Sequence, residues 1–335
     1  MYTLGIETSC DETSASVVKN GTQVLSNVVS SSLRFHKKYG GVVPEIAFRK
    51  QLETITQVSD GSLVRAGISL RAIDLVSVTD GPGLLGSLLV GISFAKTLSL
   101  GLGVPLVGVD HLLSHIYAGF LGSQGERPIL PFVALVVSGG HTSLYYVKDF
   151  DAIELLGATL DDACGEAFDK VAKILGLGYP GGPVIEQWAR NGDPSKITFV
   201  CSNTKRALDF SFSGIKTAVL YYVQRHPLDR ALHKASGREL TRDIAASFQE
   251  SVINTLIKKS FLACRLKKTK RLVLGGGVVA NNRLREEFSR EAQKSNLSIY
   301  FPEKEFCTDN AAMVAGLGFR LFKKGKRSGL DLTAH

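Results

Sequence analysis

His111 and His115 are the residues of this sequence best suited to bind a metal ion. Their spacing of four places both imidazoles on one face of a helix that Asp110 can cap. That geometry suits a shared metal ion. Such a pair also occurs without a metal, and Leu112 stands where the H-E-x-x-H peptidase motif carries its glutamate. A metal site therefore needs a third ligand from elsewhere in the chain.

Asp309 is the candidate for that third ligand. It precedes Asn310 at the predicted start of the last helix, where aspartate is also a preferred N-cap residue. The sequence thus leaves two hypotheses for this carboxylate, a helix cap and a metal ligand. If it is a ligand, we expect one metal to bridge two domains of the protein.

Two turns rich in small hydroxyl or glycine residues could bind phosphate. Residues 7–13 read Glu-Thr-Ser-Cys-Asp-Glu-Thr, and residues 138–142 read Ser-Gly-Gly-His-Thr. Each turn lies between two predicted strands, and backbone N–H groups in such turns can cradle a phosphate. Either turn alone suits an ordinary hairpin. As a matched pair on repeated units, they are typical of the ATPase superfamily that contains actin and the sugar kinases.

Two further glycine runs could approach a nucleotide. Residues 275–277 are three glycines that follow a predicted strand and open a helix, which allows close backbone approach. Residues 81–86 read Gly-Pro-Gly-Leu-Leu-Gly and fit G-x-G-x-x-G. However, no acidic residue lies about 20 positions on to hold a ribose, and Pro82 removes an N–H donor. We therefore expect no dinucleotide site at this run.

Hydrophobic periodicity places these motifs on two similar α/β units of order β-β-β-α-β-α-β. In the first unit, strands are predicted at 3–7, 14–18, 23–29, 75–79 and 106–109, with helices at 44–65 and 84–100. The second unit has strands at 132–137, 143–148, 152–158, 271–274 and 298–301, with helices at 161–175, about 240–256 and 282–294. A last helix is predicted at 310–323.

This repeat predicts an α/β protein of the actin-like ATPase (ASKHA) fold, with two tandem RNase H-like domains and a central cleft. We place the N-terminal domain at residues 1–130 and the C-terminal domain at 131–335. The second domain carries an insertion at about 176–238. The last helix is a candidate to pack back on the N-terminal domain.

Composition excludes several classes of protein. The chain has 335 residues and 44% hydrophobic content, enough for two packed domains, and its net charge of +9 weakly favours a polyanionic partner. Five scattered cysteines without a C-x-x-C spacing indicate neither a disulfide framework nor a thiolate zinc site.

The apolar stretch 84–109 is long enough to suggest a membrane span, but it contains Lys96 and several glycines, so a buried helix and strand are expected there. With no apparent leader before the first strand, we expect a cytoplasmic protein.

A series of motifs across nearly the whole chain resembles the signatures of the TsaD family of tRNA threonylcarbamoyltransferases, in the same order. They are residues 5–14 (GIETSCDETS), 81–84 (GPGL), the pair His111 and His115, 137–142 (VSGGHT), 168–170 (FDK), 179–183 (YPGGP), 210–216 (FSFSGIK), 276–278 (GGV) with Ala280 and Asn281, and 308–310 (TDN).

The resemblance implies an acyltransferase. Its substrate would be threonylcarbamoyl-AMP, and the threonylcarbamoyl group would go to the exocyclic amine of the adenosine 3′ to the anticodon, in tRNAs that read codons starting with A, with release of AMP. The resemblance also implies two protein partners, TsaB and the ATPase TsaE. Two alternatives are a zinc metallopeptidase, which the missing glutamate disfavours, and a non-catalytic scaffold like TsaB, which lacks the histidine pair.

The resemblance also implies a metal and its ligands. His111, His115 and Asp309 match the family's metal ligands, with Fe²⁺ as the expected ion and Zn²⁺ as the alternative. Archaeal and eukaryotic relatives add a tyrosine ligand where this chain has Val136. A water or an intermediate's oxygen would then complete the coordination shell.

Matching positions imply the binding site for the adenylate. The loop that would hold it consists of Val137, Ser138, Gly139, Gly140 and His141. The positions that would contact its adenosine are Asp169, Gly182, Glu186 and Asn281. Glu186 stands where relatives often carry aspartate, which keeps the charge but changes the reach of the side chain.

Three residues are candidates for roles in the reaction. Asp11 and Glu12 are expected to face phosphate or its Mg²⁺, or to be solvated turn carboxylates. His141 could accept the proton of the attacking amine, or could only hydrogen-bond the ligand. Two basic clusters, 34–38 and 265–271, could contact tRNA or be solvated, and the first is the stronger candidate because it lies in a loop of the N-terminal domain.

Overall fold

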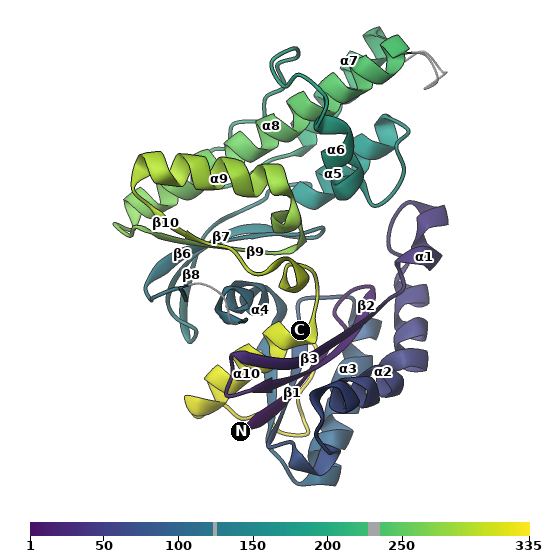
Figure 1. Cartoon of the computed structure of the whole chain (residues 1–335), viewed down its shortest axis with the longest axis vertical. Helices are drawn as coiled ribbons and strands as arrows, with labels where there is room; N and C mark the ends of the chain where they lie inside the picture. The colour runs from purple at the N-terminus through teal and green to yellow at the C-terminus, as the bar shows by residue number, and fades with distance from the viewer. Residues whose placement is uncertain (123–125, 227–234) are drawn as a thin grey trace. The chain divides into compact units, whose positions relative to one another are not determined.

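The computed structural model describes residues 1–122, 126–226 and 235–335, which form two compact units (Figure 1). Unit 1 comprises Met1–Pro128 and Pro302–His335, and unit 2 comprises Ile129–Phe301. The C-terminal domain predicted at 131–335 is therefore too long at its end, because the last segment packs with the first unit. Residues 227–234 of the predicted insertion lie outside the described residues.

Unit 1 is built on a five-stranded sheet of order β3-β2-β1-β4-β5. Its strands are β1 (Tyr2–Glu7), β2 (Glu12–Lys19), β3 (Gln23–Ser31), β4 (Leu75–Gly81) and β5 (Leu106–Asp110). The first three form an antiparallel meander, whereas β4 pairs in parallel with both β1 and β5. The parallel pairs place the ends of β1, β4 and β5 at one edge of the sheet, where functional side chains can meet.

Five α-helices are described in unit 1. They are α1 (Leu33–His36), α2 (Pro44–Ala66), α3 (Leu85–Leu102), α4 (His111–Tyr117) and α10 (Ala311–Lys323). Proline at the first position suits the start of α2, and Gly67 ends it in the left-handed region, with φ of 68°.

The two faces of the unit 1 sheet carry different helices. Leu4 and Ile6 of β1 belong to a buried cluster that includes Ile55 of α2 and Leu88 of α3. Side chains alternate along a strand, so Gly5 lies on the opposite face, where α10 packs. Helix α10 is therefore part of the core of unit 1 (Figure 1).

Helix α3 has the length and apolarity of a helix that could cross a membrane. Its residues Leu88, Ile92 and Ala95 are buried against the rest of unit 1, and the parallel strand β5 follows it. These contacts account for its apolar sequence, as a crossover helix packed on a sheet. The predicted buried helix followed by a strand is confirmed.

Unit 2 repeats the sheet of unit 1, with order β8-β7-β6-β9-β10. The strands are β6 (Phe132–Val137), β7 (Thr142–Asp149), β8 (Ala152–Ala158), β9 (Arg271–Gly275) and β10 (Ser298–Tyr300). Again the first three strands are antiparallel and the last two are parallel to β6 or to each other. The predicted repeat of one β-β-β-α-β-α-β unit is confirmed.

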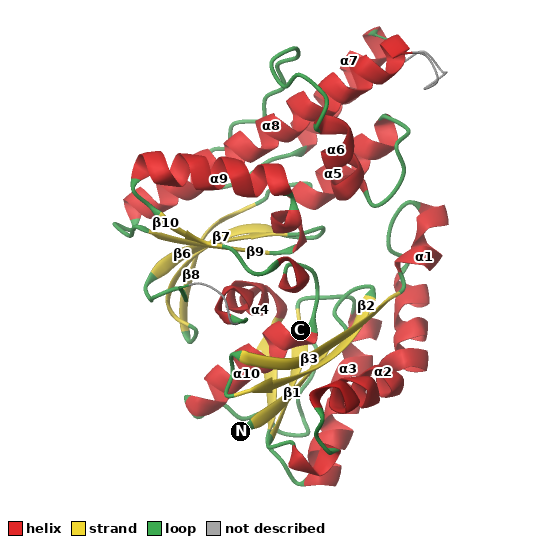
Figure 2. Cartoon of the chain, in the orientation of Figure 1, coloured by secondary structure: helices red, strands yellow, loops and turns green. Residues whose placement is uncertain are grey.

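The described helices of unit 2 are α5 (Cys164–Ile174), α6 (Gly181–Ala189), α7 (Ser213–Arg225), α8 (Ala235–Leu266) and α9 (Asn282–Ser295). Figure 2 shows them gathered on one side of the unit 2 sheet. Helices α6 and α7 fall within the predicted insertion, and α8 is longer than the predicted 240–256. Helix α5 begins three residues later than predicted, because Asp161 and Asp162 form a connection to the 210–216 segment instead.

Candidate metal and nucleotide sites

His111, His115 and Asp309 come together within unit 1. Their potential ligand atoms all lie within 4.8 Å of one another. The Nε2 atoms of His111 and His115 lie 3.6 and 3.1 Å from Oδ1 of Asp309. Both imidazoles are buried, and the two rings are 4.6 Å apart in an edge-on arrangement. This two-histidine, one-carboxylate set is typical of ferrous iron sites, and zinc also accepts it.

Asp309 is not the N-cap of the last helix. The cap of α10 is Asn310, whose side-chain oxygen accepts a hydrogen bond from the backbone N–H of Met313 at 3.2 Å. Asp110, in contrast, caps α4 as predicted and accepts a hydrogen bond from the N–H of Leu113 at 2.8 Å. The capping hypothesis for Asp309 is therefore wrong, and its carboxylate faces the histidines instead.

The prediction that this site bridges two domains is also wrong. Asp309 belongs to the segment Pro302–His335, which is part of unit 1 together with His111 and His115. The backbone N–H of Ala311, at the start of α10, donates to Oγ of Ser14 on β2 at 2.9 Å. The sheet of unit 1 thus positions both the histidine helix and the aspartate.

The side chain of His115 has the properties of a metal ligand. Its exposed fraction is 0%, and neither ring nitrogen has an aligned hydrogen-bond partner among the described residues, although Asp309 is near. A buried polar group without a partner destabilises a fold by roughly 1–3 kcal/mol. A cation bound by Nε2 would satisfy this imidazole, so the residues present fit a metal ion.

Several negative charges surround the three candidate ligands. Burial raises the pKa of Glu12, and the charges of Asp309 and Asp11 raise it further. Burial alone would lower the pKa of His111, but the charges of Asp309 and Glu7 outweigh it and raise the pKa to about 9. Like charges at such short range favour a cation at their centre. The charge of Asp309 therefore acts on Glu12, which with Asp11 was predicted as a pair.

The turn between β1 and β2 is held by residues that sequence reasoning missed. Gln51 of α2 is buried, and its Nε2 donates to the carbonyls of Thr8, Cys10 and Glu12 at 2.9 to 3.2 Å. The N–H of Leu84 donates to the carbonyl of Ser9 at 2.8 Å. The GPGL motif therefore packs against this turn.

The basic segment 34–38 is anchored through His36. This imidazole is buried; its Nδ1 accepts from the N–H of Val43 at 3.2 Å, and its Nε2 lies 2.9 Å from Oγ of Ser32. Ser32 in turn donates to the carbonyl of Asp11 at 2.8 Å. His36 is thus a structural residue, whereas Lys37 and Lys38 are exposed and available for an anionic partner.

In unit 2, the loop after β6 is open on one side. Ser138 and His141 close it with two hydrogen bonds, from the N–H of Ser138 to the carbonyl of His141 and from the N–H of His141 to Oγ of Ser138. A Cβ added to Gly139 or Gly140 would meet nothing within 4 Å. The loop therefore leaves room for a ligand beside its backbone, as the prediction for residues 137–141 requires.

The residues predicted to contact adenosine lie on neighbouring elements of unit 2, and three of the four make hydrogen bonds within the protein. Oδ1 of Asp169 accepts from the N–H of Gly181 at 2.6 Å, and the Cα of Gly182 faces open space. Oε1 of Glu186 accepts from the backbone and the side chain of Asn282, at 3.1 and 2.6 Å. Asn281 caps α9.

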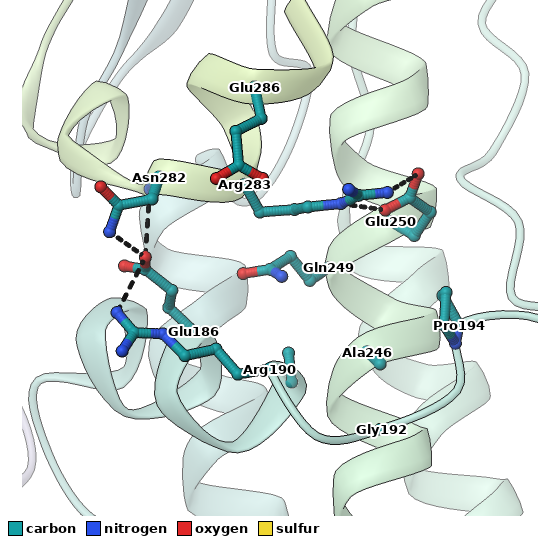
Figure 3. A pocket seen from close by; sticks show the side chains of 11 residues that line it. Glu186, Arg190, Gly192, Pro194, Ala246, Gln249, Glu250, Asn282, Arg283 and Glu286 are labelled. Carbon is teal, nitrogen blue, oxygen red and sulfur yellow. Dashed lines mark hydrogen bonds and ion pairs between the residues drawn. The ribbon is translucent and has the colours of Figure 1, made fainter.

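Glu186 lines a pocket of about 360 Å³ between α6, α8 and α9 (Figure 3). Gln249 of α8 points into this pocket, and Arg283 reaches across it to Glu250 at 3.0 Å. Nδ2 of Asn281 donates to Gln249 at 2.8 Å, so the pocket connects two of the four predicted adenosine contacts. Its size suits a small ligand.

Two adjacent aspartates, Asp161 and Asp162, bind residues of the FDK and FSFSGIK motifs. Asp161 accepts hydrogen bonds from the hydroxyls of Ser211 and Ser213, at 2.6 and 2.7 Å. Asp162 pairs with Lys170 and Lys216 at 2.6 and 2.9 Å. Burial tends to raise the pKa of Asp162, but the bonds to the two lysines outweigh it and lower the pKa. The FDK and FSFSGIK motifs therefore meet on one carboxylate, and no local sequence signal pointed to it.

Solved structures with low sequence identity define the class of fold. The activator of the 2-hydroxyisocaproyl-CoA dehydratase from Clostridium difficile matches with a TM-score of 0.56 and 16% identity, over 97% of each chain. Full-length HypF matches with a TM-score of 0.60 and 14% identity, over 96% of this chain and 46% of HypF. The chain therefore has the actin-like ATPase fold, here with a candidate metal site in its first unit.

Sequence comparison identifies the family within that class. The family model TsaD, tRNA N6-adenosine threonylcarbamoyltransferase, matches residues 23–316. A relative described by that same name in Thermosipho africanus is 51% identical, over 100% of this chain and 98% of the relative. Another, in Dictyoglomus turgidum, is 50% identical, and it too aligns over 100% of this chain and 98% of its own length. This chain belongs to the TsaD family.

Proposed function

We propose that this chain is a tRNA N6-adenosine threonylcarbamoyltransferase that uses a metal ion held by His111, His115 and Asp309. The transferase activity follows from membership of a family whose model matches residues 23–316 and whose relative in Thermosipho africanus covers the whole chain. The observation that carries the metal is the buried imidazole of His115, whose Nε2 lies 3.1 Å from Oδ1 of Asp309 without an aligned hydrogen bond. Fe²⁺ is the ion that this ligand set favours, with Zn²⁺ as the alternative.

A metal at this site would act as a Lewis acid and a template for the oxygens of the threonylcarbamoyl group. The protein residues supply positioning. AMP is already a good leaving group, so holding the amine and the carbonyl in line accounts for much of the acceleration. His141 is our candidate for accepting the proton of the amine, because its loop leaves open space for a ligand.

Unit 2 would bind the adenylate. Gly139 and Gly140 present backbone without side chains, which suits a phosphate or carboxylate group. Asp169, Gly182, Glu186 and Asn281 would surround the adenosine. Asp11 and Glu12 are acidic, so a phosphate near them requires a cation such as Mg²⁺ between the charges.

A reconstituted assay tests the activity. We expect tRNA incubated with threonine, bicarbonate, ATP and the adenylate-making enzyme to gain threonylcarbamoyladenosine only when this chain and its partners are added. Mass spectrometry of the digested tRNA measures the product. A parallel incubation with a glycoprotein tests the peptidase alternative. Absence of the modified nucleoside from the complete mixture, or cleavage of the glycoprotein, would contradict the proposal.

We propose that tRNA binds partly through Lys37 and Lys38, on the segment anchored by His36 and Ser32. Each phosphate contact contributes about one unit to the slope of log affinity against log salt. Replacing both lysines by alanine should reduce that slope by about two units. Filter binding at several salt concentrations measures it.

The matched control replaces Lys196 and Lys294, which are exposed but paired with Asp243 and Glu291 at 3.7 and 2.8 Å. This variant loses the same charge, but both lysines are already paired with carboxylates, so its slope should stay near that of the wild type. Equal slopes for both double variants and the wild type would move the tRNA surface elsewhere.

We also propose that TsaB and TsaE are partners and that the complex is cytoplasmic. Unit 1 exposes apolar side chains on α2 and α3, with exposed fractions of 61% for Leu52 and 64% for Leu85. These residues suit a protein partner with an apolar surface. Omitting TsaB or TsaE from the assay should therefore reduce transfer.

A further inference from the structure

Glu7 is a buried carboxylate at the end of β1, and no role in the reaction accounts for it so far. Its exposed fraction is 0%. Ionised carboxylates are very rarely buried unless hydrogen bonds and charges satisfy them. The N–H of Ser9 donates to Oε1 at 2.5 Å, and the hydroxyl of Thr79 donates to Oε2 at 2.6 Å. Among the described residues, Oε2 also contacts Nδ1 of His111, at 3.2 Å.

The contact with His111 determines which ring nitrogen carries the proton. Glu7 already accepts from Ser9 and Thr79, and an ionised carboxylate can only accept, so Nδ1 of His111 must be the donor. The other nitrogen, Nε2, is the atom that faces Asp309 at 3.6 Å. With its proton on Nδ1, a neutral imidazole presents the lone pair of Nε2 to the candidate metal position.

We propose that Glu7 is a positioning residue, which holds the proton of His111 on Nδ1 and so keeps Nε2 available to a metal ion. Carboxylates that bond the outer nitrogen of a ligating histidine fix its tautomer and increase its basicity. Ser9 is the competing partner, because its Oγ lies 3.1 Å from the same Nδ1. The inference rests on the proposed metal site, and it assigns the orienting role to Glu7 over Ser9.

In Glu7→Gln the new side-chain amide can take two orientations, and both disturb the hydrogen bonds around the candidate metal site. If the new amide nitrogen takes the place of Oε1, it faces the N–H of Ser9, and two donors oppose each other. If it takes the place of Oε2, it donates to Nδ1 of His111 and moves the ring proton to Nε2, where it blocks the metal. In the first case the amide oxygen still accepts from Nδ1, but it carries no negative charge and increases the basicity of the imidazole less, so in both cases we expect the variant to bind metal less tightly.

Titration of metal-free full-length chain with Zn²⁺ and Co²⁺ tests this inference by calorimetry. We expect Glu7→Gln to bind about 10- to 100-fold more weakly than the wild type, and Ser9→Ala to bind nearly as well. The matched control is Glu287→Gln in unit 2, another buried glutamate, which pairs with Arg283 at 2.9 Å and with Arg290. That control removes a buried charge without touching the site, so its metal affinity should not change.

Nitrogen NMR of histidine-labelled, Zn²⁺-loaded wild-type chain supplies a second readout that needs no variant. We expect His111 to carry its proton on Nδ1 and to bind zinc through Nε2. Zinc on Nδ1, or wild-type affinity in Glu7→Gln, overturns the role of Glu7. If the wild type itself binds no zinc or cobalt, or if His115→Ala binds them as tightly as the wild type does, the proposed metal site itself is wrong.

Discussion

Asp309→Asn is expected to keep the fold, to lose its bound metal and to lose threonylcarbamoyl transfer. The carboxylate lies 3.1 Å from Nε2 of His115 and 3.6 Å from Nε2 of His111, whereas the capping of α10 belongs to Asn310. Removing the charge therefore weakens metal binding without removing a helix cap. Outer partners of metal ligands typically contribute 10- to 100-fold in affinity, so we expect loss of a direct ligand to exceed about 100-fold.

Asp110→Asn is the matched control for this experiment. It makes the same chemical change in the same unit, one residue from His111, but Asp110 caps α4 and asparagine caps a helix about equally well. Elemental analysis and the transfer assay on the same preparations decide the matter. The expected result is metal and activity near wild type in Asp110→Asn and neither in Asp309→Asn, His111→Ala or His115→Ala. Full metal occupancy with wild-type transfer in Asp309→Asn would falsify the three-residue site.

Gly5→Ala is expected to destabilise unit 1 strongly, although it adds only one methyl group. A Cβ at this position would lie 2.2 Å from the carbonyl oxygen of Ala311 and 2.7 Å from the nitrogen of Ala315. Both are backbone atoms of α10, so the helix itself must move away from β1. Overpacking of this kind typically destabilises a protein by about 1–3 kcal/mol, occasionally more. Because Asp309 immediately precedes α10, we also expect weaker metal binding.

Gly101→Ala serves as the control, since it adds the same methyl group near the end of α3. A Cβ there meets nothing within 4 Å, and alanine favours a helix over glycine by about 0.5–1 kcal/mol. Urea unfolding followed by circular dichroism should show Gly5→Ala destabilised and Gly101→Ala equal to or above the wild type. A Gly5→Ala chain as stable as the wild type would mean that α10 is not held closely on β1.

Local pattern was sufficient to predict most of the fold. Strand β6 and strand β8 have the predicted ends, and α2 begins at the predicted proline, because period-two alternation and capping signals act over a few residues. The histidine pair could be predicted for the same reason, since a spacing of four on one helix is a local property. The repeat of the two units followed from the order of such elements.

Contacts between distant segments could not be predicted in this way. Glu7 and His111 are 104 residues apart, and they meet because β1, β4 and β5 lie side by side in parallel. The register of those strands places Glu7, Thr79 and the start of α4 at one edge of the sheet. No residue near Glu7 in the sequence indicates that an imidazole will face it.

Asp309 shows most clearly the difference between what the local sequence predicts and what tertiary packing decides. The sequence by itself determined that a carboxylate precedes the last helix, and it allowed a cap or a ligand. Only the packing of α10 on the unit 1 sheet decided between them, because the segment from Pro302 returns to unit 1 and Asn310 takes the cap. Helix signals depend on neighbours a few residues away, whereas a metal site depends on which buried surfaces the whole chain brings together.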